Sequence, residues 1–128
     1  MADEKHAISW FEIPAANITR ASKFYSTILG IEMNNMEWQG AKMAFFPGGK
    51  ETIHGALVES EGYVPSEKGA VVYLNGSPDL SAVLGKVEKA GGKVLKPKFA
   101  IGEHGFIAYF KDTEGNIFGM IQNYKEAK

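Results

Sequence analysis

The feature of this sequence that most constrains its fold is an internal duplication. Residues 43–46 (MAFF) match residues 107–110 (IAYF) at a shift of 64, and residues 53–57 (IHGAL) match residues 117–121 (IFGMI) at the same shift. Element order, spacing and residue identity agree between the halves, as expected when one structural unit is used twice. The chain should therefore fold as two similar units.

Each copy starts with a strand that leads into a helix and continues with three strands. In the first copy, residues 7–13 are apolar apart from Glu12, and Pro14 ends the strand. Apolar residues then recur at three- and four-residue spacing between Asn17, an N-cap residue type, and Gly30, a helix stop. Three strands separated by Gly-rich turns follow at residues 31–38, 42–46 and 52–59.

The second copy repeats this order. Residues 70–75 form a strand, and Ser77-Pro78-Asp79 supplies a capping hydroxyl, a proline for the first helical position and an acid for the first turn. The helix ends at Gly91-Gly92. Strands then follow at residues 93–99, 106–111 and 116–123.

Together these patterns predict an α+β fold made of two tandem βαβββ units. The units cover about residues 7–60 and 69–123, and their strands should form a curled mixed sheet. A chain of 128 residues is long enough for one core and too short for two independent ones, so we expect a single domain spanning residues 1–128.

Composition excludes several classes of function. The chain has no cysteine, which rules out disulfides, thiolate metal sites and cysteine nucleophiles. Its 14 Lys and Arg residues nearly balance 15 Asp and Glu residues and do not cluster, so nucleic acid is not an expected partner. No segment approaches about 18 uninterrupted apolar residues, so a membrane is not an expected partner either. A cytoplasmic location is the resulting expectation.

Two motifs at the ends of the duplicated region carry a resemblance to a known family. The first runs from Ile13-Pro14 into a helix that contains Phe24-Tyr25 and ends at Leu29-Gly30. The second is FKDTEGNIFG at residues 110–119, similar to a closing F-x-D-P-D/E-G-N strand pair, with Thr113 in the place often held by proline. With the duplication, they resemble the glyoxalase/bleomycin-resistance (vicinal oxygen chelate) superfamily over nearly the whole chain.

The resemblance implies a cleft in which metal-dependent members hold a divalent ion with His or Gln on each first strand and Glu on each fourth. Here those positions fall on Trp10, on Val71 or Val72, and on Gly55 and Gly119. Indole has no usable lone pair, valine has no donor atom and glycine has no side chain, so the usual four-ligand site cannot form. We therefore expect no metal and no other cofactor. Bleomycin-resistance-type members, by resemblance, simply bind a ligand in the cleft.

Strand alternation, combined with this resemblance, selects the side chains expected to line the cleft. Most are apolar or aromatic, which is typical of a small-molecule site. The predicted ligand-binding residues are Trp10, Glu12, Met43, Phe45, Gly55, Leu57, Tyr73, Tyr109, Gly119 and Ile121. On the same reasoning His54 faces away from the cleft.

Glu12 is the predicted catalytic residue or polar anchor of this cleft. A carboxylate among Trp and Ile side chains should be desolvated, a condition that suits acid–base catalysis. The alternative is that Glu12 pairs with a nearby lysine or with Tyr73 at the rim. Trp10 either fills the space that a metal would occupy or stacks on a ligand.

Three functions remain open at this point. The leading hypothesis is a metal-free protein that binds a small, apolar or partly aromatic molecule. The second is a lyase or isomerase that uses Glu12 as acid or base, or a non-standard metal site made from Glu12 and His54. The third is a structural or regulatory module whose own side chains fill the cleft. The resemblance also implies a homodimer, with the units pairing either within one chain or between chains.

Overall fold

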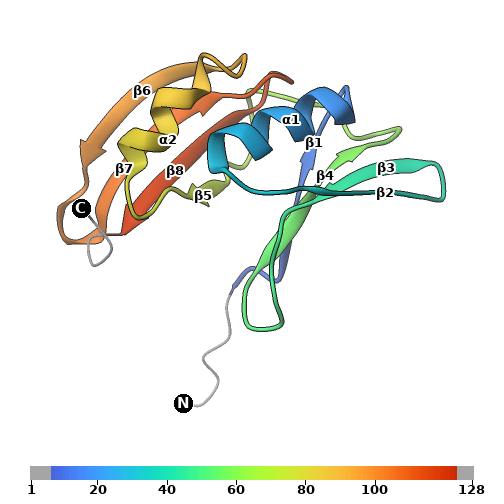
Figure 1. Cartoon of the computed structure of the whole chain (residues 1–128), viewed down its shortest axis with the longest axis horizontal. Helices are drawn as coiled ribbons and strands as arrows, with labels where there is room; N and C mark the ends of the chain where they lie inside the picture. The colour runs from blue at the N-terminus through green and yellow to red at the C-terminus, as the bar shows by residue number, and fades with distance from the viewer. Residues whose placement is uncertain (1–6, 124–128) are drawn as a thin grey trace.

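The computed structural model describes residues 7–123, which fold into two βαβββ units lying side by side (Figure 1). The first unit consists of β1 (Trp10–Pro14), α1 (Ile18–Leu29), β2 (Asn34–Trp38), β3 (Ala41–Phe45) and β4 (His54–Glu59). The second consists of β5 (Tyr73–Asn75), α2 (Leu80–Val87), β6 (Lys93–Ala100), the short 3-10 helix η1 (Gly102–His104), β7 (Gly105–Lys111) and β8 (Ile117–Asn123). The predicted α+β class with two tandem units is confirmed.

Each unit forms its own four-stranded mixed sheet. The strand order is β1-β4-β3-β2 in the first sheet and β5-β8-β7-β6 in the second. β1 runs parallel to β4 and β5 runs parallel to β8, whereas the other pairs are antiparallel. β1 and β5 are thus edge strands, and the two sheets remain separate instead of closing into one barrel.

Helix α1 forms because its apolar residues share one stripe and both of its ends are capped. Phe24 and Ile28 are buried on that stripe. The Asn17 side chain accepts a hydrogen bond from the backbone nitrogen of Arg20 at 3.0 Å, and Gly30 ends the helix in the left-handed region at φ 65°. Within residues 7–123, no helix has both the length and the apolar character needed to cross a bilayer.

Helix α2 starts later than its sequence suggests. Asp79 is the N-cap, and its side chain accepts a hydrogen bond from the backbone nitrogen of Ser81 at 3.1 Å. The predicted cap, Ser77, is occupied elsewhere, because its hydroxyl accepts a hydrogen bond from the backbone nitrogen of Asn123 at 3.1 Å. The prediction of Ser77 as the cap was wrong because a donor on β8 uses that hydroxyl.

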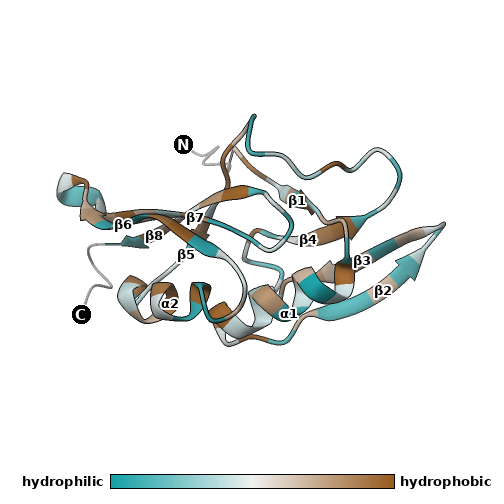
Figure 2. Ribbon diagram, turned by 90° about the horizontal axis from the view of Figure 1, so that it is seen from above, coloured by the Kyte–Doolittle hydropathy of each residue, from teal (hydrophilic) through white to brown (hydrophobic). Residues whose placement is uncertain are grey.

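Both helices cover the same side of the two sheets and share one apolar core (Figure 2). Tyr25 of the first unit packs against Phe118 of the second, with ring centroids 5.7 Å apart, and Phe24 packs against Phe110 at 6.0 Å. Large aromatic rings of this kind contribute much of the buried area of a small core. The opposite side of the sheets, which we call the helix-free face, presents the residues that alternate with these core residues.

The turn between β7 and β8 fastens the second unit to the first. The side chain of Glu114 is fully buried. Its carboxylate accepts hydrogen bonds from the backbone nitrogens of Ala16 at 2.9 Å and Asn17 at 2.8 Å, and from Arg20 Nε at 2.7 Å. It thereby satisfies donors at the start of α1 and places a negative charge at the positive end of the helix. Burial alone would raise the pKa of Glu114, but hydrogen bonds from Arg20 and Thr113 outweigh it and lower that pKa.

Two further side chains of this turn complete the junction between the units. The Tyr25 hydroxyl donates to Asp112 Oδ2 at 2.7 Å, and Asn116 Nδ2 donates to the backbone oxygen of Pro14 at 2.8 Å. Burial and the negative charge of Asp112 raise the pKa of Tyr25 well above its ordinary value, so this phenol keeps its proton. The junction is therefore polar in its contacts but enclosed by the shared core.

We expect Glu114→Gln to lower the free energy of unfolding by roughly 2 kcal/mol at neutral pH, because a buried carboxylate with several donors is replaced by a neutral group. The folded-state pKa of Glu114 lies below its ordinary value of 4.5. Its contribution is therefore complete above that value and is lost as the pH falls toward the lowered pKa. Urea unfolding across the acid range should show the gap between wild type and variant closing. Glu103→Gln in exposed η1 is the matched control, and equal effects of the two substitutions would contradict this role for Glu114.

Candidate functional site

The helix-free face gathers most of the side chains predicted to line a cleft. Strand partners point to the same side of a sheet, so the register shows which residues share a face. Trp10 pairs with His54, and both Tyr73 and Tyr109 pair with Gly119. The structure places these predicted residues on the helix-free face: Trp10, Glu12, Met43, Phe45, Tyr73, Tyr109, Gly119 and Ile121.

Gly55 and Leu57 face the helices, contrary to the prediction. Leu57 pairs with the core residues Ile13 and Ala44 and is 0% exposed. Gly55 points to the same side, where a Cβ atom would lie 2.1 Å from the carbonyl oxygen of Phe11 and 2.7 Å from its ring. A glycine is required there by the close approach of β1 and not by a ligand.

This error comes from an offset of one residue between the two units. Ala44 pairs with Leu57. Its counterpart in the second sheet, Ala108, pairs with Met120, which the sequence alignment matches with Ala56. The connection before β4 is longer than the turn before β8. As a result, the pairing of β4 with β3 is shifted by one residue from the position that the sequence alignment of the two units predicts. Ala56 is therefore the structural counterpart of Gly119.

His54 lies on the helix-free side, although alternation predicted that it would face away. It is the strand partner of Trp10, and the two rings meet edge-on with centroids 5.5 Å apart. Its Nδ1 atom is buried and has no hydrogen-bond partner among the residues that the structure describes. The loop before β4 packs on this ring so closely that a Cβ atom at Gly48 would overlap it. The same offset of β4 explains the wrong assignment.

The positions that hold a metal in metal-dependent relatives do not fit an ion in this chain. With the offset included, they are Trp10, Ala56, Val71 and Gly119. The indole nitrogen of Trp10 donates to Glu12 Oε2 at 3.1 Å, and the other three side chains have no donor atoms for a metal. In the described part of the chain, no three His, Asp or Glu residues come together as a metal site.

Glu12 is exposed and has two hydrogen-bond donors. Trp10 is one, and the Tyr63 hydroxyl donates to Glu12 Oε1 at 2.7 Å. Glu12 is therefore not desolvated, contrary to the prediction. Its hydrogen-bond partners are Trp10 and Tyr63, and not a lysine or Tyr73. The hydrogen bond to Glu12, with the negative charge of that carboxylate, raises the pKa of Tyr63. Sequence reasoning missed Tyr63 because it lies in the irregular segment that links the units, where no periodicity points to a partner.

Tyr73 and Tyr109 form the corresponding polar pair on the second unit. Their hydroxyl oxygens are 2.6 Å apart, and their rings meet at a steep angle with centroids 5.9 Å apart. The Tyr73 ring covers Gly119 so closely that a Cβ atom there would lie 2.5 Å from it. The hydrogen bond with Tyr109 raises the pKa of Tyr73, so its hydroxyl stays protonated at neutral pH.

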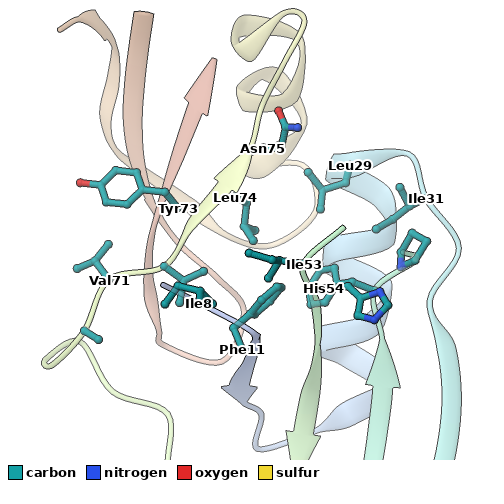
Figure 3. Close-up of a pocket in the computed structure, with 14 residues that line it drawn as sticks. Ile8, Phe11, Leu29, Ile31, Ile53, His54, Val71, Tyr73, Leu74 and Asn75 are labelled. Atoms are coloured by element: carbon teal, nitrogen blue, oxygen red, sulfur yellow. The ribbon is translucent and has the colours of Figure 1, made fainter. Parts of the chain in front are cut away.

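A pocket of about 620 Å³ lies where the two units meet (Figure 3). Four segments form it: the start of β1, the end of α1, the loop before β4 and the segment that includes β5. We call it the junction pocket, and its lining includes the apolar residues Ile8, Phe11, Leu29, Ile31, Ile53, Val71 and Leu74 and the polar residues His54, Tyr73 and Asn75.

Of the residues predicted for the site, Tyr73 lines the junction pocket. Lining residues such as Leu29, Phe46 and Asn75 were not predicted, because they come from separate segments. Apolar residues such as Leu29 and Phe46 read as ordinary core positions in the sequence. Only the packing of one unit beside the other leaves a hollow between them.

Comparison with known proteins gives a consistent family match. The family model described as Glyoxalase/Bleomycin resistance protein/Dioxygenase superfamily matches residues 7–120. A glyoxylase-like domain-containing protein from Didymella fabae is 36% identical over 122 residues, which cover 88% of this chain and 91% of that protein.

Solved structures show the same fold. An antibiotic binding protein from Streptomyces sp. CB03234, TnmS3, superposes with a TM-score of 0.72 and 18% identity, over 94% of this chain and 98% of that one. Glyoxalase I from Zea mays superposes with a TM-score of 0.68 and 19% identity, over 90% of this chain. The match spans 44% of the maize protein, so this chain corresponds to less than half of that enzyme.

Alanine substitutions at the two strand glycines should have different costs. We expect Gly55→Ala to destabilise the fold by roughly 2–3 kcal/mol, because the new methyl group meets fixed backbone in β1. Gly119→Ala should cost less, because the nearest atoms to the new methyl group belong to the exposed Tyr73 ring, which can swing away. Urea unfolding measures both, and a Tyr73→Ala background should remove most of the Gly119→Ala cost. Equal costs at the two glycines would contradict their opposite facing.

Proposed function

Because the chain belongs to the glyoxalase/bleomycin resistance protein/dioxygenase superfamily, we propose that it is a metal-free small-molecule-binding protein whose ligand occupies the junction pocket. The observation that carries this proposal is a hollow of about 620 Å³ with a largely apolar lining. Ligand sites in proteins typically enclose roughly 300–1,000 Å³ and contain few polar groups. The lining therefore favours an apolar or partly aromatic molecule.

The structural likeness to TnmS3 supports a small-molecule ligand, since that protein is described as antibiotic binding. At 18% identity the likeness concerns the fold, so the identity of its ligand is not carried over. What the two chains share is a scaffold of two units, and in this chain the space between the units is the pocket.

The helix-free face supplies aromatic walls beside the pocket. Tyr73 belongs to both the helix-free face and the junction pocket, and its hydroxyl shares a hydrogen bond with that of Tyr109. Trp10 lies edge-on to His54, a pocket residue, and edge-on to Phe45 with centroids 5.9 Å apart. We propose that these side chains contact the part of the ligand that projects from the pocket. Met43, Gly119 and Ile121 extend the same surface.

Glu12 is proposed as a polar anchor on this surface. Two donors hold its carboxylate in place, and the residue is exposed and so accessible to a ligand. The alternative, a lyase or isomerase step with Glu12 as acid or base, stays a prediction. The substitution Glu12→Gln distinguishes an anchoring role from a catalytic role. If Glu12 is catalytic, the variant should lose turnover and still bind its ligand, whereas if Glu12 is an anchor, only the affinity should change.

Exposed aromatic and apolar side chains on the helix-free face favour a homodimer. Met36 is 49% exposed and Trp38 is 62% exposed, and both lie on that face of β2. Surfaces of this kind are commonly covered by a protein partner. Light scattering after size-exclusion chromatography should then give twice the chain mass of 14.0 kDa, and a monomer at high concentration would contradict the proposal.

The balance of 14 basic and 15 acidic residues supports a small molecule, and not nucleic acid, as the partner. A cytoplasmic location remains a prediction, which fractionation of cells that express the chain would check.

Filling the pocket should abolish binding. We expect Ile53→Trp to weaken binding of the neutral fluorescent probe N-phenyl-1-naphthylamine at least about tenfold, because Ile53 lies in the middle of the lining (Figure 3) and a larger ring takes the space of the ligand. Fluorescence titration of the probe measures the affinity. Leu95→Trp, at an exposed position on β6, is the matched control and should bind like the wild type. Unchanged affinity in Ile53→Trp would place the ligand elsewhere.

A further inference from the structure

The helix-free face carries opposite charges on its two units. Among the lysines in the described strands of the second sheet, Lys93, Lys96 and Lys111 lie on the helix-free face, and these strands contain no Asp or Glu. On the first sheet, the acid of the helix-free face is Glu12, the strand partner of Ala56. A ligand that lies across both units therefore meets a negative group on one side and positive groups on the other.

Lys96 is the lysine placed to meet a ligand on this face. It is the strand partner of Tyr109, so the two side chains lie on the same side of the sheet. Its Nζ atom lies 4.2 Å from the centroid of the Phe99 ring, and Phe99 lies 6.3 Å from Tyr109, centroid to centroid. The cation–π contact holds the ammonium group over the aromatic patch without neutralising it.

The lysines Lys111 and Lys98 have other contacts. Lys111 Nζ is bonded to Glu67 Oε2 at 2.5 Å, which neutralises it. Lys98 Nζ lies 4.7 Å from the ring of Phe106, a residue that packs against the core on the helix side. No carboxylate within residues 7–123 pairs with Lys96. Its charge is therefore available to an anion.

The pair formed by Tyr73 and Tyr109, next to Lys96, has one hydroxyl proton that the hydrogen bond within the pair does not use. When two hydroxyls share one hydrogen bond, one of the two protons lies between the oxygens and the other is free to donate outward. The oxygens of Tyr73 and Tyr109 are 2.6 Å apart and both residues lie on the helix-free face. An acceptor oxygen placed beside the pair can thus receive a hydrogen bond from one of them while Lys96 supplies the compensating charge.

We infer that the second unit binds the carboxylate of an aromatic carboxylic acid, with Lys96 as the charged contact and the Tyr73–Tyr109 pair as the hydrogen-bond donor. This inference rests on the proposed function, because it names the class of ligand for the same site. Tyr73 borders the junction pocket (Figure 3). The ring of such a ligand would therefore enter the apolar hollow while its carboxylate stays on the second sheet. Glu12 can anchor a hydrogen-bond donor of the ligand, but it repels the ligand carboxylate from the first unit and so selects this orientation.

The test compares three probes of one shape with different charge: 2-naphthoate, neutral 2-naphthamide and the cation 2-naphthylmethylamine. Isothermal titration calorimetry at low salt measures their affinities for the wild-type chain, for Lys96→Met and for the control Lys98→Met. We expect 2-naphthoate to bind about tenfold more tightly than 2-naphthamide, as a charge-assisted hydrogen bond provides. Lys96→Met keeps the apolar stem and should remove this preference without changing the affinity for 2-naphthamide, whereas Lys98→Met should retain it.

Each other outcome overturns the inference. Equal binding of 2-naphthoate and 2-naphthamide, or a preference that survives in Lys96→Met, shows that Lys96 does not select the ligand, and leaves the proposed function intact. Tightest binding of 2-naphthylmethylamine assigns selection to Glu12. If none of the three binds, the inference fails, and binding of N-phenyl-1-naphthylamine decides the proposed function separately. Circular dichroism melting curves establish that the variants are folded.

Discussion

The arrangement of the two units depends on the buried carboxylate of Glu114. It lies in the β7–β8 turn of the second unit, yet its hydrogen bonds go to the backbone at the start of α1 and to Arg20 in the first unit. Because those backbone donors have no partner inside the helix, an acceptor from elsewhere satisfies them. The Tyr25–Asp112 bond adds a second connection through the core. These contacts set the relative position of the edge strands β1 and β5, and hence the hollow between them.

One-sided burial explains why the candidate site lies where it does. Both helices cover the same side of the sheets, so alternate residues of β1, β3, β4, β5, β7 and β8 enter the core and the rest form the helix-free face. That face combines aromatic rings with two separate polar groups, Glu12 with Tyr63 on the first unit and Tyr73 with Tyr109 on the second. The duplicated units are alike in backbone, but their helix-free faces carry Glu12 on one and lysines on the other, so a ligand can be oriented across them.

Sequence reasoning succeeded where local chemistry decides structure, and it failed where the length of a connection does. The Asn17 cap, the Gly30 stop and the order of strands follow from the chain itself. The matched glycines Gly55 and Gly119 do not share a role, because a longer connection moves β4 by one residue and a shift of one residue reverses the face of every side chain. That single offset accounts for the wrong placement of Gly55, Leu57 and His54.

The sequence by itself determined the element order and the repeated unit, since both depend on residue type and spacing. Tertiary structure alone decided the faces of β4, the pairing of Tyr63 with Glu12 and the existence of the junction pocket. Each of these joins residues that are distant in the chain, and their meeting depends on loop length and on how one unit packs against the other. No local pattern of residues contains that information.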